Sequence, residues 1–309
     1  MSILVVGSVA LDSVETPFGK ADGVLGGSAV FFSAAASLLA PVQVVGVVGE
    51  DYPIEELRSS MNGRVDLSGL MTAPGESFRW SGVYSYDLNS RETLETRLGV
   101  FADFRPRIPA NFRNARHVFL GNIDPRLQME VLDQVEAPEI VVCDTMNFWI
   151  EGSRDALLEL LTRVDFLLVN DSEARQLAGE PNLLQAARWI QARGPRMVAI
   201  KKGEHGAILF VEDRVFFVPG YPLEEVFDPT GAGDAFAGGL LGYLASAGTT
   251  TLEDLRLATV FGSALGSFAV EDFSIRRFAD LGPDEIRQRV QEFREMTTFE
   301  YGLSAAPQG

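Results

Sequence analysis

The sequence predicts an α/β fold of three layers, in which a doubly wound, mostly parallel sheet lies between two layers of helices and carries a small β-sheet lid. Short, fully apolar runs alternate with helical patterns along most of the chain, as they do where parallel strands are buried on both faces. One segment, residues 78–100, breaks this rhythm: aromatic and β-branched residues alternate around a turn-like DLNS, which predicts an inserted hairpin.

The alternation starts at the beginning of the chain. Residues 3–6 and 42–48 are apolar runs that each end at a glycine, which indicates buried strands. Between them, residues 29–39 are rich in alanine and leucine and stop before Pro41, as a helix does. Further strands are expected at 117–120, 140–143, 166–169 and 197–200, with helices at 154–163 and 183–191.

The hairpin at 78–100 and the segment 11–18 are expected to form the small sheet of the lid. The alternative is an ordinary hairpin at the edge of the main sheet. Towards the C-terminus, a strand-like segment from Val215 precedes helical patterns at 235–245, 252–269 and 283–296. Residues 302–309 are small and polar, which predicts a disordered tail.

Composition and charge narrow the classes of function. The chain has 46% hydrophobic residues, and 26 basic against 43 acidic residues give a net charge of −17. Such a charge repels phosphate backbones and anionic lipid surfaces, so neither a nucleic acid nor a membrane is expected as a partner. The single cysteine, Cys143, excludes an intrachain disulfide. With no signal-peptide pattern at the start, a cytoplasmic protein is expected.

The strongest motif is DPTGAGD at residues 228–234, between a strand-like and a helical segment. Gly231 and Gly233 can turn their amides into one concavity at a helix N-terminus, which favours an anion by about 0.3 to 1 kcal/mol. At the rim of this cradle, the Asp234 carboxylate can take the proton from a hydroxyl that attacks a γ-phosphoryl group. The alternative is a plain turn in which Asp234 caps the helix. The dinucleotide-binding and P-loop glycine patterns are both absent from the sequence.

The stretch DPTGAGDAFAGG resembles the signature D-T-x-G-A-G-D-x-F of the PfkB, or ribokinase-like, family of carbohydrate and nucleoside kinases. Further matches follow in order over nearly the whole chain: Gly7-Ser8, Asp12, Gly26-Gly27, the hairpin, residues 170–173 and residues 203–206. The resemblance implies one kinase domain over residues 1–301, with the lid formed by about 11–18 and 78–100.

The implied activity is ATP- and Mg²⁺-dependent phosphorylation of a hydroxyl on a small polyol, most readily a sugar or sugar-like carbohydrate. Two alternatives stay open. One is a nucleoside kinase of the same fold. The other is a regulatory protein that binds a nucleotide or a sugar without turnover.

The resemblance assigns roles to the motif and to a second segment. It makes Asp234 the catalytic base and the amides of Gly231, Ala232 and Gly233 the anion hole. Residues 170–173 match the family's N-x-x-E, in which Asn170 and Glu173 help to hold Mg²⁺ and the triphosphate, often through water. The alternative for this pair is helix capping after the strand at 166–169.

Two further groups would serve the nucleotide and a cation. Similar loops pass over the nucleotide where this chain has Lys201, Gly203 and Gly206, although a lysine at such a place can also be solvated. Asp228 and Thr230 match positions that supply oxygen ligands to a monovalent cation. K⁺ activation stays open, because residues 269–274 lack the glycine commonly found there.

Candidate residues for the acceptor come from the ends of the first strands. Asp12 stands where similar enzymes bind substrate hydroxyls, and Gly26 and Gly27 would let the substrate approach backbone amides. Asp124 and Asn147 follow predicted strands, at the edge where ligands bind in open α/β sheets, although ordinary loop hydrogen bonds explain them equally well.

Some departures from the family pattern bear on specificity. Ala10 and Phe31 stand where a ribokinase has asparagine, which counts against ribose as the acceptor. The lid arginines Arg91 and Arg97 can reach a charged substrate, or can be solvated. Aromatic residues of the lid and the first helix can stack on a nucleobase or a sugar, or can pack the lid itself. The apolar residues Phe78, Trp80 and Val83 would also suit a homodimer through the lid.

Overall fold

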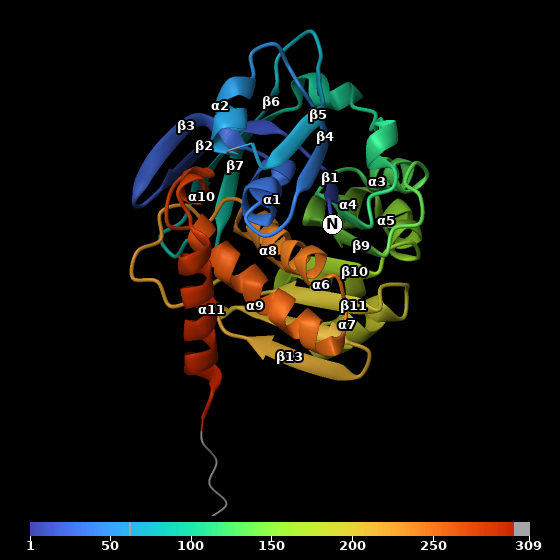
Figure 1. The fold of residues 1–309 in the computed structure, drawn as a ribbon, viewed down its shortest axis with the longest axis vertical. Helices are drawn as coiled ribbons and strands as arrows, with labels where there is room; N and C mark the ends of the chain where they lie inside the picture. The colour runs from blue at the N-terminus through green and yellow to red at the C-terminus, as the bar shows by residue number, and fades with distance from the viewer. Residues whose placement is uncertain (62, 300–309) are drawn as a thin grey trace, which may run out of the picture.

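The computed structural model describes residues 1–61 and 63–299, so the predicted tail at 302–309 lies outside the described residues. A nine-stranded sheet runs through the molecule in the order β13-β12-β11-β10-β9-β8-β1-β4-β5 (Figure 1). Seven strands pair in parallel, and the last two pair antiparallel at one edge. The strands are β1 (Ile3–Val6), β4 (Val42–Val48), β5 (Val65–Thr72), β8 (His117–Leu120), β9 (Ile140–Asp144), β10 (Phe166–Asn170), β11 (Met197–Lys201), β12 (Ala207–Val211) and β13 (Arg214–Val218).

Alternate residues of the central strands face two separate helix layers. In β1, Ile3 and Val5 join one core, whereas Leu4 and Val6 join the other, and all four are buried. The first layer contains α1 (Ser28–Ala36), α2 (Ile54–Ser60), α8 (Ala232–Ala247), α9 (Leu252–Ala269), α10 (Arg276–Ala279) and α11 (Pro283–Thr297). The second contains α3 (Pro125–Leu132), α4 (Asn147–Gly152), α5 (Arg154–Leu161), α6 (Asp171–Ala178) and α7 (Leu183–Gln191). The predicted three-layer architecture is confirmed.

The lid is a separate four-stranded sheet in the order β3-β2-β6-β7, at the end of the molecule away from β13 (Figure 1). It consists of β2 (Ala10–Thr16), β3 (Gly19–Gly26), β6 (Phe78–Tyr84) and β7 (Arg91–Arg97). The alternative of a hairpin at the edge of the main sheet is therefore wrong. A small cluster of Val14, Ala21, Tyr84 and Phe273 packs the lid onto the main domain.

Two of the lid residues considered for a dimer contact are used within the chain. The Phe78 ring stacks on Phe101 at a centroid distance of 5.4 Å. The Trp80 indole donates a hydrogen bond to Thr93 of the neighbouring strand. In the described part of the chain, no helix is both long and apolar enough to cross a membrane.

Two helices begin earlier than expected, which matters for the site. Helix α1 starts at Ser28 and ends at Ala36, and α8 starts at Ala232 rather than at residue 235. The DPTGAGD motif therefore supplies the first turn of α8 itself, where backbone N–H groups have no acceptor within the helix. The Ala232 amide donates to the Pro229 carbonyl at 3.3 Å.

Candidate active site

Three polar residues end three adjacent parallel strands. Asp144 is the last residue of β9, Asn170 of β10 and Lys201 of β11. Because parallel strands end at one edge of a sheet, the topology places these side chains next to one another, at the edge where open α/β sheets bind ligands.

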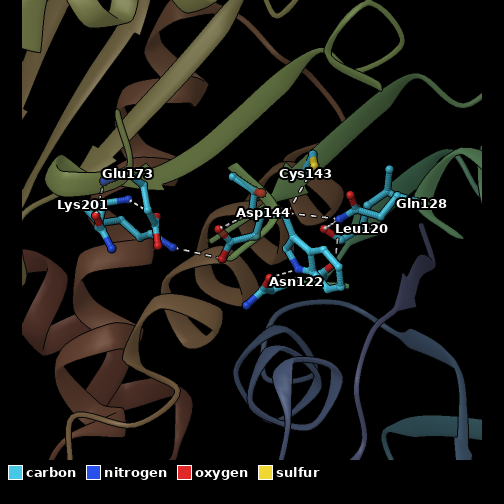
Figure 2. A network of polar contacts seen from close by, with 11 residues as sticks. Leu120, Asn122, Gln128, Cys143, Asp144, Glu173 and Lys201 are labelled. Atoms are coloured by element: carbon cyan, nitrogen blue, oxygen red, sulfur yellow. Dashed lines mark hydrogen bonds and ion pairs between the residues drawn. The ribbon is translucent and has the colours of Figure 1, made fainter. Parts of the chain in front are cut away.

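Lys201 and Asp144 form a buried ion pair. The Lys201 Nζ lies 3.0 Å from Asp144 Oδ2, and the two side chains are only 17% and 7% exposed. Figure 2 shows this contact as a dashed line. Burial alone would lower the pKa of Lys201, but the carboxylates of Asp144, Glu173 and Asp234 together raise it. Lys201 is therefore a stable cation within an acidic cluster.

The position of Asp144 is fixed from behind by Gln128. The Gln128 side-chain amide is fully buried and donates to the carbonyls of Leu120, Gly121 and Asp144, which lie at the ends of β8 and β9 (Figure 2). The Asp144 carboxylate also accepts from the amide of Thr145 at 2.8 Å. Asp144 was not among the predicted site residues.

Asn170 and Glu173 form a capping box at the start of α6. The Asn170 side chain accepts from the Glu173 amide, and the Glu173 carboxylate accepts from the Asn170 amide, both at 2.7 Å. The capping alternative is therefore realised. Burial, reinforced by the charge of Asp144, raises the pKa of Glu173 to about 7, against the opposing effect of Lys201. The role of this pair towards Mg²⁺ stays a prediction.

The anion cradle is built around Gly231. This residue has a φ of 75° and is the N-cap of α8. A Cβ atom there would lie 2.2 Å from the Phe31 ring, so both backbone and packing require glycine. A Cβ on Gly233 would lie 3.0 Å from Lys201 Nζ, which places the lysine ammonium directly against the cradle.

Asp234 occupies the first turn of α8, and α8 has no side-chain capping hydrogen bond. The alternative in which Asp234 serves as a helix cap is therefore wrong. Burial raises the pKa of Asp234 to about 7, with a further contribution from Asp144, while Lys201 and Arg91 act in the opposite direction. A carboxylate with a pKa near neutrality is suited to accept a proton.

The loop before the cradle connects to the lid. The buried carboxylate of Asp228 accepts from the Thr230 amide at 2.8 Å, and burial raises its pKa. The Thr230 hydroxyl donates to the hydroxyl of Tyr84, on lid strand β6, at 3.2 Å. The lid is thus hydrogen-bonded to the residue that precedes the anion cradle.

Asp12 lies beneath the lid beside the glycine pair. A Cβ on Gly26 would lie 2.0 Å from Asp12 Oδ2, so Gly26 makes room for this carboxylate. Burial raises the pKa of Asp12 to about 7, although the Gly27 amide donates to it and partly offsets the effect.

Asp124 and Asn147 have structural partners of their own. Asp124 caps α3 by accepting from the Arg126 amide at 2.8 Å, and its carboxylate also pairs with the Arg126 side chain. The Asn147 side chain donates to Gln176. Ordinary hydrogen bonding accounts for both, and their role towards a substrate stays a prediction.

The loop after β11 meets the tip of the lid. A short 3-10 turn begins at Gly203 and is followed by Gly206, and the Lys202 amide donates across this loop to the Gly206 carbonyl at 2.7 Å. A Cβ on Gly203 would lie 3.1 Å from the side-chain oxygen of Asn89, in the turn between β6 and β7. The lid therefore touches both the motif loop and this second glycine loop.

The acidic cluster does not form a metal cage of protein atoms. Among residues 1–61 and 63–299, no group of three or more His, Cys, Asp or Glu side chains is arranged to hold a metal ion. Mg²⁺ usually binds through one or two carboxylates together with water and substrate phosphates. Glu173 offers such a carboxylate.

A helix N-terminus with glycine amides, a lysine ammonium against it and a carboxylate in the same turn are the groups that a phosphoryl-transfer site requires. Comparison with known proteins agrees. The model of the pfkB family carbohydrate kinases matches residues 24–279. A cytidine kinase from Thermococcus kodakarensis is 30% identical over 246 residues, which cover 78% of this chain and 87% of that protein.

Solved structures show the same fold. The nucleoside kinase of Methanocaldococcus jannaschii, an archaeal member of the ribokinase family, superposes with a TM-score of 0.74 at 20% identity, covering 94% of this chain and 98% of its own. A putative ribokinase II from E. coli, in complex with ATP and Mg²⁺, gives 0.75 at 19% identity over 94% and 99% of the two chains. The chain belongs to the PfkB family of carbohydrate kinases, and it is a phosphotransferase.

Proposed function

We propose that the protein transfers the γ-phosphoryl group of ATP to a hydroxyl of a small sugar or sugar-like polyol, with Asp234 as the base. The observation that carries the proposal is the position of Asp234. Its half-buried carboxylate shares the first turn of α8 with the Gly233 amide and lies within the electrostatic reach of Lys201 and Asp12. Such a site brings a proton acceptor and an anion-binding cradle within one helical turn.

Each group has a definite task in the proposed reaction. The acceptor hydroxyl binds beneath the lid near Asp12 and gives its proton to the Asp234 carboxylate as its oxygen attacks the phosphorus atom. The amides of Gly231, Ala232 and Gly233, together with the Lys201 ammonium, stabilise the charge on the transferred phosphoryl oxygens and on the departing ADP. Asp144 holds the ammonium in place.

Glu173 and Asn170 are the residues proposed to face the nucleotide and its Mg²⁺, through water. The metal, when bound, would neutralise charge on the β- and γ-phosphates. Asp228 and Thr230 are proposed as oxygen ligands for K⁺. The glycine loop at 203–206 is proposed to pass over the nucleotide. A homodimer through the lid also remains a prediction.

A nucleoside acceptor is the second candidate, and the similarity to the T. kodakarensis cytidine kinase favours it. Both kinds of acceptor present hydroxyls, so the same base and cradle would serve either. The third candidate is a regulatory protein without turnover. It requires that Asp234 does not act as a base, and the turnover assay described next distinguishes it from the two kinase candidates.

The test is ADP release from ATP and Mg²⁺, with and without K⁺, across a panel of sugars, inositols and nucleosides. We expect turnover that depends on one class of acceptor, and the class that responds distinguishes the carbohydrate from the nucleoside proposal. Saturable binding of an acceptor with no turnover for any member of the panel would instead support the regulatory reading.

The pH dependence of turnover gives a separate prediction. Because burial and the Asp144 charge raise the pKa of Asp234 to about 7, the base is protonated and inactive below that pH. We expect kcat/KM for the acceptor to rise with pH through about 7 and then to level off, measured from about pH 5 to pH 9. An acid limb centred near 4, the ordinary value for an aspartate, would contradict the assignment.

A further inference from the structure

The lid carries three arginines that differ in their partners. Arg79 pairs with Asp51 at 2.6 Å, and Arg97 pairs with Glu95 at 3.1 Å. Arg91, at the start of β7, forms no ion pair within the described residues 1–61 and 63–299, and it is exposed. One lid cation is therefore free to bind a ligand.

The register of the lid fixes the side from which Arg91 projects. Arg91 is the strand partner of Tyr84, and directly opposed residues share one face of a sheet. Tyr84 reaches Thr230, immediately before the anion cradle, so Arg91 stands on the face that covers the site. Arg97 is the strand partner of Arg79. Side chains alternate between the two faces along β6, so Arg79, and Arg97 with it, lie on the face opposite to that of Trp80 and Tyr84.

The Trp80 ring supports Arg91 from the same face. The guanidinium carbon of Arg91 lies 5.4 Å from the centroid of the Trp80 ring. A Cβ on Gly82 would lie 2.5 Å from that ring, so the indole lies flat along β6. Stacking on an aromatic face leaves the edge donors of a guanidinium available for an anion.

The charge of Arg91 reaches three parts of the site at once. It lowers the pKa of Asp12, of Asp234 and of Glu173. In the proposed function, Asp12 lies on the acceptor side, Glu173 on the nucleotide side and Asp234 between them. A cation that interacts electrostatically with all three carboxylates lies above the place where the phosphoryl group passes from the nucleotide side to the acceptor side.

We propose that Arg91 is a catalytic residue of the lid, whose guanidinium binds the γ-phosphoryl group of ATP while the lid covers the site. The inference rests on the proposed function, because that function places ATP here. Its physical reason is the charge balance: the site holds the carboxylates of Asp12, Asp144, Glu173 and Asp234, whereas the main domain contributes Lys201 as the opposing cation. A planar guanidinium also suits two phosphoryl oxygens together.

The test compares Arg91→Met with Arg97→Met, which removes an arginine of the same strand from the other face. The affinities for ADP and for a non-hydrolysable imido analogue of ATP, each with Mg²⁺, are measured by calorimetry. We expect Arg91→Met to weaken binding of the ATP analogue by about tenfold to a hundredfold and to leave ADP unchanged, because ADP lacks the γ-phosphoryl group. Arg97→Met should change neither.

The inference is overturned if Arg91→Met binds the analogue as tightly as Arg97→Met does, or weakens ADP and the analogue equally. Because Arg91 is exposed, unchanged melting curves should confirm that both variants fold. The binding comparison needs no acceptor. Absence of turnover in the unsubstituted protein would therefore refute the proposed function without deciding whether Arg91 binds the γ-phosphoryl group. The affinities for ADP and for the ATP analogue decide that question alone.

Discussion

Asp234→Asn should lower kcat by about 10² to 10⁴. Asparagine keeps the size of the side chain but cannot accept the proton of the attacking hydroxyl.

The change Asp234→Asn should also raise the free energy of unfolding near pH 8. In the folded protein the pKa of Asp234 lies at about 7, above its value in the unfolded chain, so the ionised carboxylate destabilises the fold at pH values above that range. The gain should shrink as the pH falls below about 7 and disappear below about 4, where the wild-type carboxyl becomes protonated in both states.

Asp254→Asn is the matched control, because Asp254 occupies the third position of the neighbouring helix α9. There the carboxylate accepts from Thr251 and Thr249, and these hydrogen bonds lower its pKa. The control should therefore lose stability at neutral pH and keep its activity, which is the reverse of Asp234→Asn. Acceptor-dependent turnover and thermal melting at several pH values measure both. A kcat within tenfold of wild type in Asp234→Asn would rule out Asp234 as the base.

Lys201→Met should lower the free energy of unfolding by about 3 to 5 kcal/mol, because it leaves the buried Asp144 carboxylate without its partner at 3.0 Å. Turnover should also be lost, since the ammonium lies 3.0 Å from where a Cβ on Gly233 would stand, beside the cradle. Urea unfolding and ADP release are the measurements.

The double variant Lys201→Met/Asp144→Asn separates these two effects. It removes the unpaired charge together with the lysine, so most of the stability should return while turnover stays lost. If the double variant is as unstable as Lys201→Met alone, the ion pair is not the source of the stability change, and the role assigned to Asp144 is wrong.

Three of the strands buried on both faces were predicted with the correct bounds: residues 3–6, 42–48 and 117–120 are β1, β4 and β8. The predictions at 140–143, 166–169 and 197–200 each end one residue before β9, β10 and β11 do. The residues left out are the polar Asp144, Asn170 and Lys201, because a mostly apolar run indicates burial and a polar residue at its end does not. Strands β3, β5 and β12 were missed. β3 reads GKADGVLG and half of its residues are exposed, and β5 has polar residues at alternate positions, so neither has the apolar continuity of a central strand. β12 is apolar but begins only six residues after the end of β11, behind a loop whose lysine and glycines dominate the sequence pattern there.

The candidate site was predictable where it depends on a contiguous motif. It was less predictable where it depends on contacts between residues that lie far apart in the sequence. DPTGAGD identified the cradle and Asp234 because all its parts lie within seven residues. Asp144 and Lys201 are 57 residues apart, and only the order of the parallel strands brings them together. The N-x-x-E pattern has the opposite ambiguity: the spacing that suits a metal-binding pair also suits a capping box, and the structure contains the latter.

The hairpin of β6 and β7 touches two loops of the main domain: Tyr84 meets Thr230 beside the cradle, and Asn89 meets Gly203 in the second glycine loop. Both contacts belong to the single hairpin of β6 and β7. A rigid hairpin that covers one of these loops therefore covers the other as well. One opening motion would then set the exit of both products. The order in which ADP and the phosphorylated acceptor leave would depend on their affinities for the open site rather than on separate gates, and the slower departure would limit the cycle.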